Sequence, residues 1–267
     1  MKMIRENIEI TMPDSTLRKV RVALPDDYRE SDEIYNVLYM FDGQNLFDEE
    51  DSFAGEIWNV HNALDTLVKE KKIRPMVIIG IDNGGESRLD EYGPWPFKDE
   101  FYSSRGEGDL FAEYFVQTLL PLMEEKYRVS REKNGRFIAG SSMGALITAY
   151  VVTKFKDVFS SAGIFSLASW VSEKPFLQML MDEGSYDDLR FFVQVGTEET
   201  RLTDGNPDYA DSQEYINNSL NFLKAVLLKG ANIDNICVRI GAGKTHNESA
   251  WAGYMPEFLL WLNERVK

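Results

Sequence analysis

The pentapeptide Gly140–Gly144 reads Gly-Ser-Ser-Met-Gly, which fits the pattern G-x-S-x-G. An apolar run, 136–139, precedes it and a helix-like run, 145–150, follows it. This is the context of a nucleophile elbow, in which a serine stands on a strained turn between a strand and a helix. The helix N-terminus directs N–H groups and partial positive charge toward a developing oxyanion. The pattern predicts that Ser142 is the nucleophile of a serine hydrolase; the alternative is a glycine-rich turn with an exposed serine.

A nucleophilic serine needs a base, which is usually histidine, and this chain has only His61 and His246. In α/β-hydrolases the nucleophile, the acid and the base follow one another in that order along the chain. His61 lies upstream in an amphipathic run, so we expect it on a helix surface or half buried. His246 lies in a loop after the apolar run 236–240, where the base is expected. The alternative for His246 is a solvated loop histidine.

The acid should follow a strand that lies between the serine and the histidine in sequence. The run 190–195 has the composition of such a strand, and Glu198 and Glu199 come directly after it. Spacing alone does not choose between these two glutamates. Later carboxylates also remain candidates, namely Asp204, Asp208 and Asp211.

The oxyanion hole needs two N–H donors. One is expected from Met143, directly after the nucleophile, and the other from the loop after the third strand. Residues 35–41 are the expected third strand, so we predict that Gln44 supplies the second N–H, with Gly43 letting the backbone turn inward. The alternative is an ordinary Asp-Gly turn.

Composition limits the possible functions. The 267 residues are 43% hydrophobic, which predicts a single large α/β domain over 1–267. The net charge of −15 argues against nucleic-acid partners and anionic membranes. Two histidines and the lone Cys237 argue against a zinc site, and no metal or cofactor is expected. The N-terminus lacks an apolar signal segment and no run reaches transmembrane length, so a cytoplasmic location is predicted. Oligomeric state is not predicted.

The order of the expected elements predicts the fold class. Two alternating segments, 6–11 and 17–24, predict an N-terminal antiparallel hairpin. Short apolar runs then alternate with amphipathic segments, which predicts an α/β-hydrolase fold: a mostly parallel central sheet with helices on both faces. Further strands are expected at 76–81 and 162–167, and helices at 110–127, 216–227 and 250–266. Ligands of such sheets bind beyond the carboxyl ends of the strands, where the site candidates all lie.

A long stretch, 83–109, shows no regular pattern and is rich in aromatic residues, including Trp95. Long loops are often functional, so this stretch could wall the substrate cleft, with Trp170 lining the other side. The alternative is that these rings close the core beneath a long loop.

Three segments together resemble the putative-esterase family of α/β-hydrolases: the pentapeptide, the run 82–95 and the run 245–251. That family includes esterase D, feruloyl and acetylxylan esterases, and the enterochelin (trilactone siderophore) esterases. The resemblance covers roughly 15–265. It implies Ser142 as nucleophile, His246 as base, and Met143 and Gln44 as oxyanion donors. The family's acid stands three residues after the glycine that ends its strand, which selects Glu199.

The resemblance also implies an activity. We expect hydrolysis of a small-molecule ester through an acyl-enzyme, on short-chain or aromatic acyl esters of a sugar or small alcohol. The alternatives are a trilactone siderophore esterase, an acyltransferase, or a non-catalytic binding protein on the same scaffold. Arg88 and Glu91 are expected to brace the long loop, with substrate contact by Arg88 as the alternative.

Overall fold

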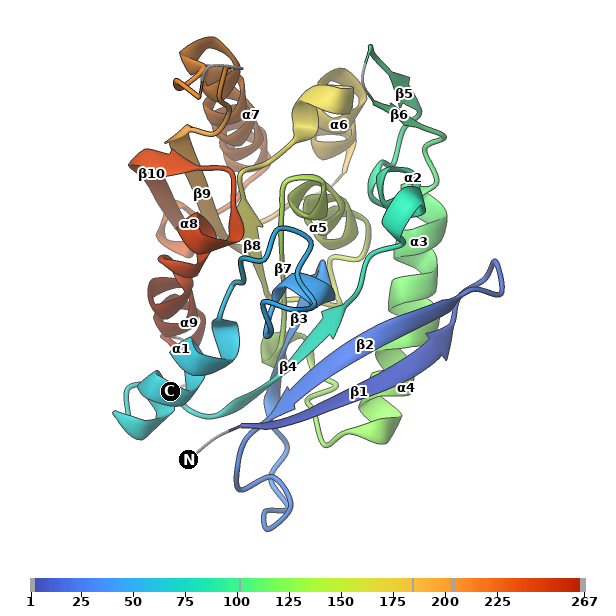
Figure 1. The fold of residues 1–267 in the computed structure, drawn as a ribbon, viewed down its shortest axis with the longest axis vertical. Helices are drawn as coiled ribbons and strands as arrows, with labels where there is room; N and C mark the ends of the chain where they lie inside the picture. Colours follow the sequence, from blue (N-terminus) through green and yellow to red (C-terminus); the bar gives the residue numbers. More distant parts are fainter. Residues whose placement is uncertain (1–2, 101, 184, 203–204, 265–267) are drawn as a thin grey trace.

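An eight-stranded sheet forms the centre of the molecule in the computed structural model, which describes residues 3–100, 102–183, 185–202 and 205–264 (Figure 1). The order across the sheet is β1-β2-β4-β3-β7-β8-β9-β10. The pairs β1–β2 and β2–β4 are antiparallel, and all other neighbours in the sheet pair parallel. The strands are β1 (Ile4–Thr11), β2 (Leu17–Leu24), β3 (Asn36–Phe41), β4 (Met76–Ile81), β7 (Arg136–Ser141), β8 (Ser161–Phe165), β9 (Arg190–Glu198) and β10 (Ile236–Thr245).

The sequence prediction of an α/β-hydrolase fold with an N-terminal hairpin is confirmed. β1 and β2 pair from Ile4↔Leu24 to Thr11↔Leu17. The tight turn between them contains Ser15 in the left-handed region, and the Asp14 carboxylate accepts hydrogen bonds from Thr16. In β1 the burial alternates along most of the strand, as expected for a sheet edge with one covered face.

Helices cover both faces of the sheet. Alternate residues of β3 enter different cores: Val37 and Tyr39 lie in the larger one, and Leu38 lies in the smaller one. Helices α3 to α7 close the larger core, and α1 and α9 close the smaller one. The helices are α1 (Val60–Lys69), α2 (Arg88–Tyr92), α3 (Gly108–Tyr114), α4 (Leu120–Lys126), α5 (Met143–Lys154), α6 (Glu173–Asp182), α7 (Tyr209–Leu228), α8 (Glu248–Ala252) and α9 (Met255–Asn263).

Two long predicted helices are interrupted in the structure. Over 110–127, a π-helical segment, Phe115–Leu119, joins α3 to α4, and a proline lies in the first turn of α4. Near 250–266, α8 ends before α9 begins at Met255, again with proline in the first turn. Proline has no N–H to donate to the preceding turn, so it favours a helix start over a helix interior.

The stretch 83–109 is more ordered than its sequence predicts. It contains the 3-10 turn Gly85–Ser87, helix α2 and a small hairpin of β5 (Phe97–Lys98) and β6 (Ser103–Ser104). Each of these elements is too short to produce a recognisable hydrophobic period. The predicted cleft wall is therefore a compact structured segment that packs against α3 and α5.

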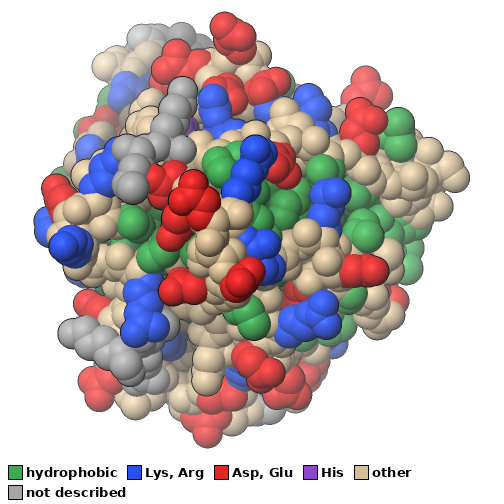
Figure 2. Space-filling view, turned by 90° about the horizontal axis from the view of Figure 1, so that it is seen from below, with side chains coloured by type: hydrophobic (Ala, Val, Ile, Leu, Met, Phe, Trp, Pro, Cys, Tyr) green, Lys and Arg blue, Asp and Glu red, His purple; other side chains and the backbone are tan. Residues whose placement is uncertain are grey.

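The parallel strands place their carboxyl ends along one edge of the sheet. Strand order reverses between β3 and β7, because β4 lies on one side of β3 and β7 on the other. Such a switch point is where open α/β sheets bind ligands. On the face seen in Figure 2, acidic and basic side chains are interspersed. Among the described helices, none has both the length and the apolar character needed to span a bilayer.

Candidate active site

The turn between β7 and α5 presents Ser142 at the switch point. Ser142 has φ 57° and ψ −126°, its N–H donates to Phe165 O (2.9 Å) and its carbonyl accepts from Ala145 N–H. A Cβ on Gly140 would overlap Gly144 O, and a Cβ on Gly144 would lie 3.1 Å from an oxygen of Asp42. The two glycines therefore permit the strained turn, which the G-x-S-x-G pattern predicted.

A buried carboxylate lies against His246. Nδ1 of His246 is 2.6 Å from Oε2 of Glu199, whose side chain is fully buried while that of His246 is 22% exposed. Strands β9 and β10 are parallel neighbours, with Thr245 in register with Glu198, so the residues that follow both strands meet. An ionised carboxylate can only accept hydrogen bonds, so this contact places the neutral imidazole's proton on Nδ1 and leaves Nε2 as an acceptor.

The other acid candidates lie elsewhere. Oε2 of Glu198 accepts from the Arg201 guanidinium at 3.2 Å. Asp208 caps the N-terminus of α7 by accepting from Ala210 N–H and Asp211 N–H, and Asp211 is exposed in the first turn of that helix. Asp204 lies outside the described residues. The geometry thus brings only Glu199, among the described candidates, to His246.

Ser166 and Gly196, to which the sequence assigned no role in the site, hold this carboxylate in place. Oε1 of Glu199 accepts from Ser166 Oγ (2.7 Å) and from Gly196 N–H (2.5 Å). Ser166 in turn accepts from Trp251 Nε1 (2.9 Å) and is fully buried, with φ 47°. The hydrogen bonds therefore fix which oxygen of Glu199 faces the imidazole. Trp251 belongs to the run 245–251 that carried the family resemblance, whereas nothing in the sequence marks Ser166.

The predicted oxyanion loop follows β3 as a 3-10 turn, Gly43–Asn45. Its hydrogen-bond ladder begins with Asn45 N–H donating to Asp42 O, so the N–H of Gln44 is not used by the turn. A Cβ on Gly43 would approach Gly80 C to 2.6 Å, so glycine is needed where the turn packs on β4. Met143 is the first residue of α5, where N–H groups also lack intrahelical partners.

The comparisons with known proteins identify the family. The family model described as "Putative esterase" matches residues 15–262. The chain belongs to the putative-esterase family. It is 25% identical over 248 residues, 92% of each chain, to the uncharacterized protein YbbA of Bacillus subtilis (strain 168).

Two solved structures have the same fold as this esterase. A ferulic acid esterase superimposes with a TM-score of 0.74 at 19% identity, covering 98% of this chain and 99% of that one. An IroE-like serine hydrolase from Shewanella oneidensis gives a TM-score of 0.76 at 18% identity, covering 98% of this chain and 80% of that one. Family and fold together make the protein a hydrolase of the esterase class.

Aromatic rings surround the imidazole of this esterase. The ring centroid of His246 lies 4.9 Å from that of Tyr215 and 5.1 Å from that of Trp251. Burial raises the pKa of Tyr215 to about 12, so its phenol is neutral at physiological pH. Tyr215, on α7, is a neighbour of His246 that the sequence did not predict.

The two predicted cleft tryptophans have different surroundings. Trp170 is half buried and its ring centroid lies 6.5 Å from that of Tyr215, the tyrosine that contacts the imidazole. Trp95 packs edge-on against Tyr150 and Phe176 and so helps to close the larger core. Substrate contact stays a prediction for both, and the surroundings favour Trp170.

Arg88 and Glu91 each have a different partner. Arg88 makes a bidentate pair with the Asp42 carboxylate (2.7 and 2.9 Å), whereas Glu91 accepts from the Arg18 guanidinium (3.0 and 2.7 Å). Burial disfavours the charged form of Arg88, but the adjacent Asp42 carboxylate outweighs this and raises the pKa of Arg88. The guanidinium is thus bound to Asp42, directly before the predicted oxyanion loop, and direct substrate contact by Arg88 stays a prediction.

Glu248 is a half-buried carboxyl beside the site. Oε1 accepts from Asn45 Nδ2 (2.7 Å). Burial, together with the negative charge of Asp42, raises the pKa of the Glu248 carboxyl above its ordinary value, although the Asn45 amide and His246 act in the opposite direction.

The raised pKa of Glu248 predicts a pH-dependent effect on stability. A carboxyl whose pKa is raised on folding favours the folded state below its unfolded pKa of about 4.3, and that contribution is lost as pH rises through the folded value. Glu248→Gln cannot ionise but keeps the acceptor for Asn45. We expect the Tm of Glu248→Gln, relative to the native protein, to increase from pH 4 upward and then level off. A difference that is constant with pH, or that increases toward low pH, would contradict this assignment.

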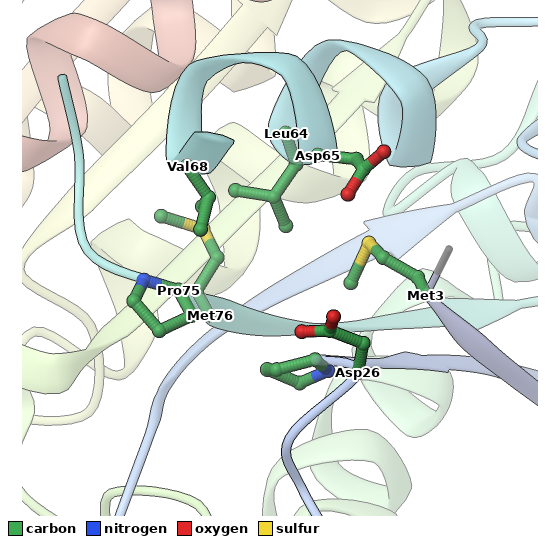
Figure 3. A pocket seen from close by; sticks show the side chains of 8 residues that line it. Met3, Asp26, Leu64, Asp65, Val68, Pro75 and Met76 are labelled. Carbon is green, nitrogen blue, oxygen red and sulfur yellow. The ribbon is translucent and has the colours of Figure 1, made fainter. Parts of the chain in front are cut away.

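A cavity between α1 and the first strands lies far from these residues (Figure 3). Its volume is about 20 Å³, enough for about one water molecule, and it is lined by Leu64, Val68 and Met76 among others. Met76 is the first residue of β4, so the cavity lies at the amino-terminal edge of the sheet, opposite the Ser142 turn. Within the described part of the chain, no group of three or more His, Cys, Asp or Glu side chains could hold a metal ion.

Proposed function

We propose that this esterase hydrolyses carboxylic esters through an acyl-enzyme formed on Ser142. The observation that carries the proposal is the buried Glu199 carboxylate held 2.6 Å from Nδ1 of His246, at the same sheet edge as the strained Ser142 turn. That contact fixes the imidazole tautomer whose free Nε2 can accept the serine proton.

The reaction then proceeds in two halves. His246 accepts the Ser142 proton as Oγ attacks the ester carbonyl, and the N–H groups of Met143 and Gln44 stabilise the tetrahedral oxyanion. The imidazolium protonates the leaving alkoxide, which departs as the alcohol. Water, deprotonated by the same imidazole, attacks the acyl-enzyme and releases the acid. Glu199 stabilises the imidazolium in both halves.

We propose short-chain or aromatic acyl esters of a sugar or small alcohol as the substrates. Two observations support neutral aromatic or short acyl groups. The ring of Tyr215 lies against the imidazole, and the half-buried ring of Trp170 lies against Tyr215, so an acyl or alcohol group could stack on aromatic surface near His246. The net charge of −15 disfavours strongly anionic ligands, among which trilactone siderophores belong.

A fluorophosphonate probe tests the nucleophile. We expect one probe per chain, on the tryptic peptide that contains Ser142, because the probe reacts only with a serine that a base activates. His246→Ala should abolish labelling. Labelling at another serine, unchanged labelling of His246→Ala, or no labelling of the native protein would each contradict the proposed mechanism; the last result would favour a binding protein.

Turnover of matched esters tests the substrate class. Acetyl, butyryl and feruloyl esters of one small alcohol are compared with a trilactone by kcat/KM, with and without an added acceptor alcohol. The proposal predicts the highest kcat/KM among the neutral esters and release of the free acid. A preference for the trilactone would support the siderophore alternative, and transfer to the added alcohol in preference to water would support an acyltransferase.

A further inference from the structure

The turn Gly43–Asn45 is fastened at both ends by side chains that the mechanism above does not use. We propose that two side-chain bridges, Asp42–Arg88 and Asn45–Glu248, are positioning devices that hold this turn so that the Gln44 N–H points at the oxyanion. The inference rests on the proposed function, since it assigns Gln44 as a donor. It gives a role to Arg88 and Glu248, two charged residues beside the site that bind neither Ser142 nor Glu199 in the structure.

The first bridge fixes the start of the turn. Oδ1 of Asp42 accepts from Arg88 Nε (2.7 Å) and Asn83 Nδ2 (2.6 Å), and Oδ2 accepts from Arg88 Nη2 (2.9 Å). Asp42 is buried and left-handed, with φ 56°, and its N–H donates to Tyr92 Oη (3.2 Å). A non-glycine residue keeps such a backbone only when its surroundings impose it, and here four hydrogen bonds do so.

The same bridge controls charge next to the oxyanion. Oδ2 of Asp42 lies 3.1 Å from the position of a Cβ on Gly144, so this carboxylate borders the turn that carries Ser142. An unpaired negative charge there would oppose the negative charge that develops on the substrate oxygen. The Arg88 guanidinium neutralises the carboxylate with two parallel hydrogen bonds, which also fix its orientation.

The second bridge fixes the end of the turn and links it to the loop that carries His246, here called the base loop. Asn45 Nδ2 donates to Glu248 Oε1 (2.7 Å), and Glu248 is two residues beyond His246. The acceptors of Asn45 are also occupied, Oδ1 by Phe53 N–H (3.1 Å) and the backbone carbonyl by Trp58 N–H (2.9 Å). The turn is therefore held from the 83–92 segment on one side and from the base loop on the other.

Kinetics on a neutral ester test the first bridge. Arg88→Gln is expected to lower kcat by about 10–100-fold, because a donor displaced by a fraction of an ångström loses much of its transition-state contact. KM should stay within about threefold, since the ground-state ester gains little from the oxyanion hole. Arg88→Lys keeps the charge but not the bidentate geometry and should fall between Arg88→Gln and the native protein. Arg105→Gln, which removes a solvent-exposed Arg–Asp90 pair in the same segment, is the matched control.

Two results would overturn the first bridge. If KM rises and kcat stays, Arg88 binds substrate directly. If neither changes beyond the Arg105→Gln control, the bridge does not position the donor. If Arg88→Gln fails to fold, the double variant Asp42→Asn/Arg88→Gln, which leaves no unpaired charge, is measured in its place. Its kcat should still fall beyond that of the Arg105→Gln control, by the part of the loss that comes from donor displacement, and KM should stay within about threefold.

A conservative pair tests the second bridge. Glu248→Ala removes the acceptor for Asn45 and should lower kcat by about 5–20-fold, whereas Glu248→Gln keeps an oxygen acceptor and should retain most of the native kcat. Equal losses in the two variants would show that the charge of Glu248, and not its bond to Asn45, is what matters.

Hydrogen exchange separates this inference from the proposed function. Peptides that cover 42–46 should exchange faster in Arg88→Gln and in Glu248→Ala than in the native protein, whether or not an ester is turned over. Failure of the fluorophosphonate probe to label Ser142 in the native protein would overturn the proposed function. Unchanged exchange in both variants would overturn the bridges alone.

Discussion

Ser142→Ala is expected to lower kcat for ester hydrolysis by about 10³–10⁶-fold, because the acyl-enzyme cannot form without its oxygen. Residual rate comes from the oxyanion donors and from substrate binding. The fold should be retained. Ser142 already has φ 57° with a Cβ present, and alanine adds no atom to the turn. Initial rates on a neutral ester, together with the Tm and the circular dichroism of the variant, measure both parts of this expectation.

Ser141→Ala is the matched control. Ser141 is the last residue of β7 and is buried, and its replacement removes a hydroxyl from the same pentapeptide. Its kcat should remain within about an order of magnitude of the native value, since its hydroxyl is not the proposed nucleophile. A Ser142→Ala protein that keeps a tenth or more of the native kcat would show that the nucleophile is misassigned.

The central strands of the sheet were predictable because they are buried on both faces. The run 76–81 is almost continuously apolar and forms β4, all of whose residues are buried. The run 162–167 predicts β8 less well, because the strand already ends at Phe165. The next residue, Ser166, has φ 47° and leaves the extended conformation. That end is set by tertiary contacts to Glu199 and Trp251, which no local pattern encodes.

The site was predictable in proportion to the rarity of its residues. A chain with two histidines leaves little choice of base, and the pentapeptide marks one serine. The two adjacent glutamates could not be separated by spacing, because a shift of one residue at a strand end reverses the side-chain direction. The structure separates them through Gly196, whose N–H binds Glu199 and at which a Cβ would overlap Lys244 O.

The sequence did not predict the polar pairs between residues that lie far apart in the chain. Arg88 meets Asp42 across 46 positions, and Glu248 meets Asn45 across 203. Helical periodicity and strand alternation report neighbours within one element, so they do not predict which arginine faces which carboxylate. Tyr215 was missed for the same reason, since an aromatic on a half-buried helix is ordinarily read as core.

Glu199→Gln is expected to lower kcat by about 10³–10⁴-fold. Oε1 accepts from Gly196 N–H and Ser166 Oγ, so in the variant the amide oxygen takes this position and the NH₂ faces His246. An NH₂ group can only donate, so Nδ1 of the imidazole must become the acceptor and the ring proton moves to Nε2. The imidazole then has no lone pair for the Ser142 proton. Steady-state kcat at neutral pH measures the loss.

Glu198→Gln is the control that isolates this effect. The two glutamates are adjacent and the two variants make the same chemical change, so any general effect of removing one negative charge from this segment is shared. Glu198 faces Arg201 with its side chain 23% exposed, and its replacement should change kcat by no more than about threefold. Comparable losses in the two variants would assign the effect to the local field, whereas a loss confined to Glu199→Gln assigns it to the orientation and tautomer of the imidazole.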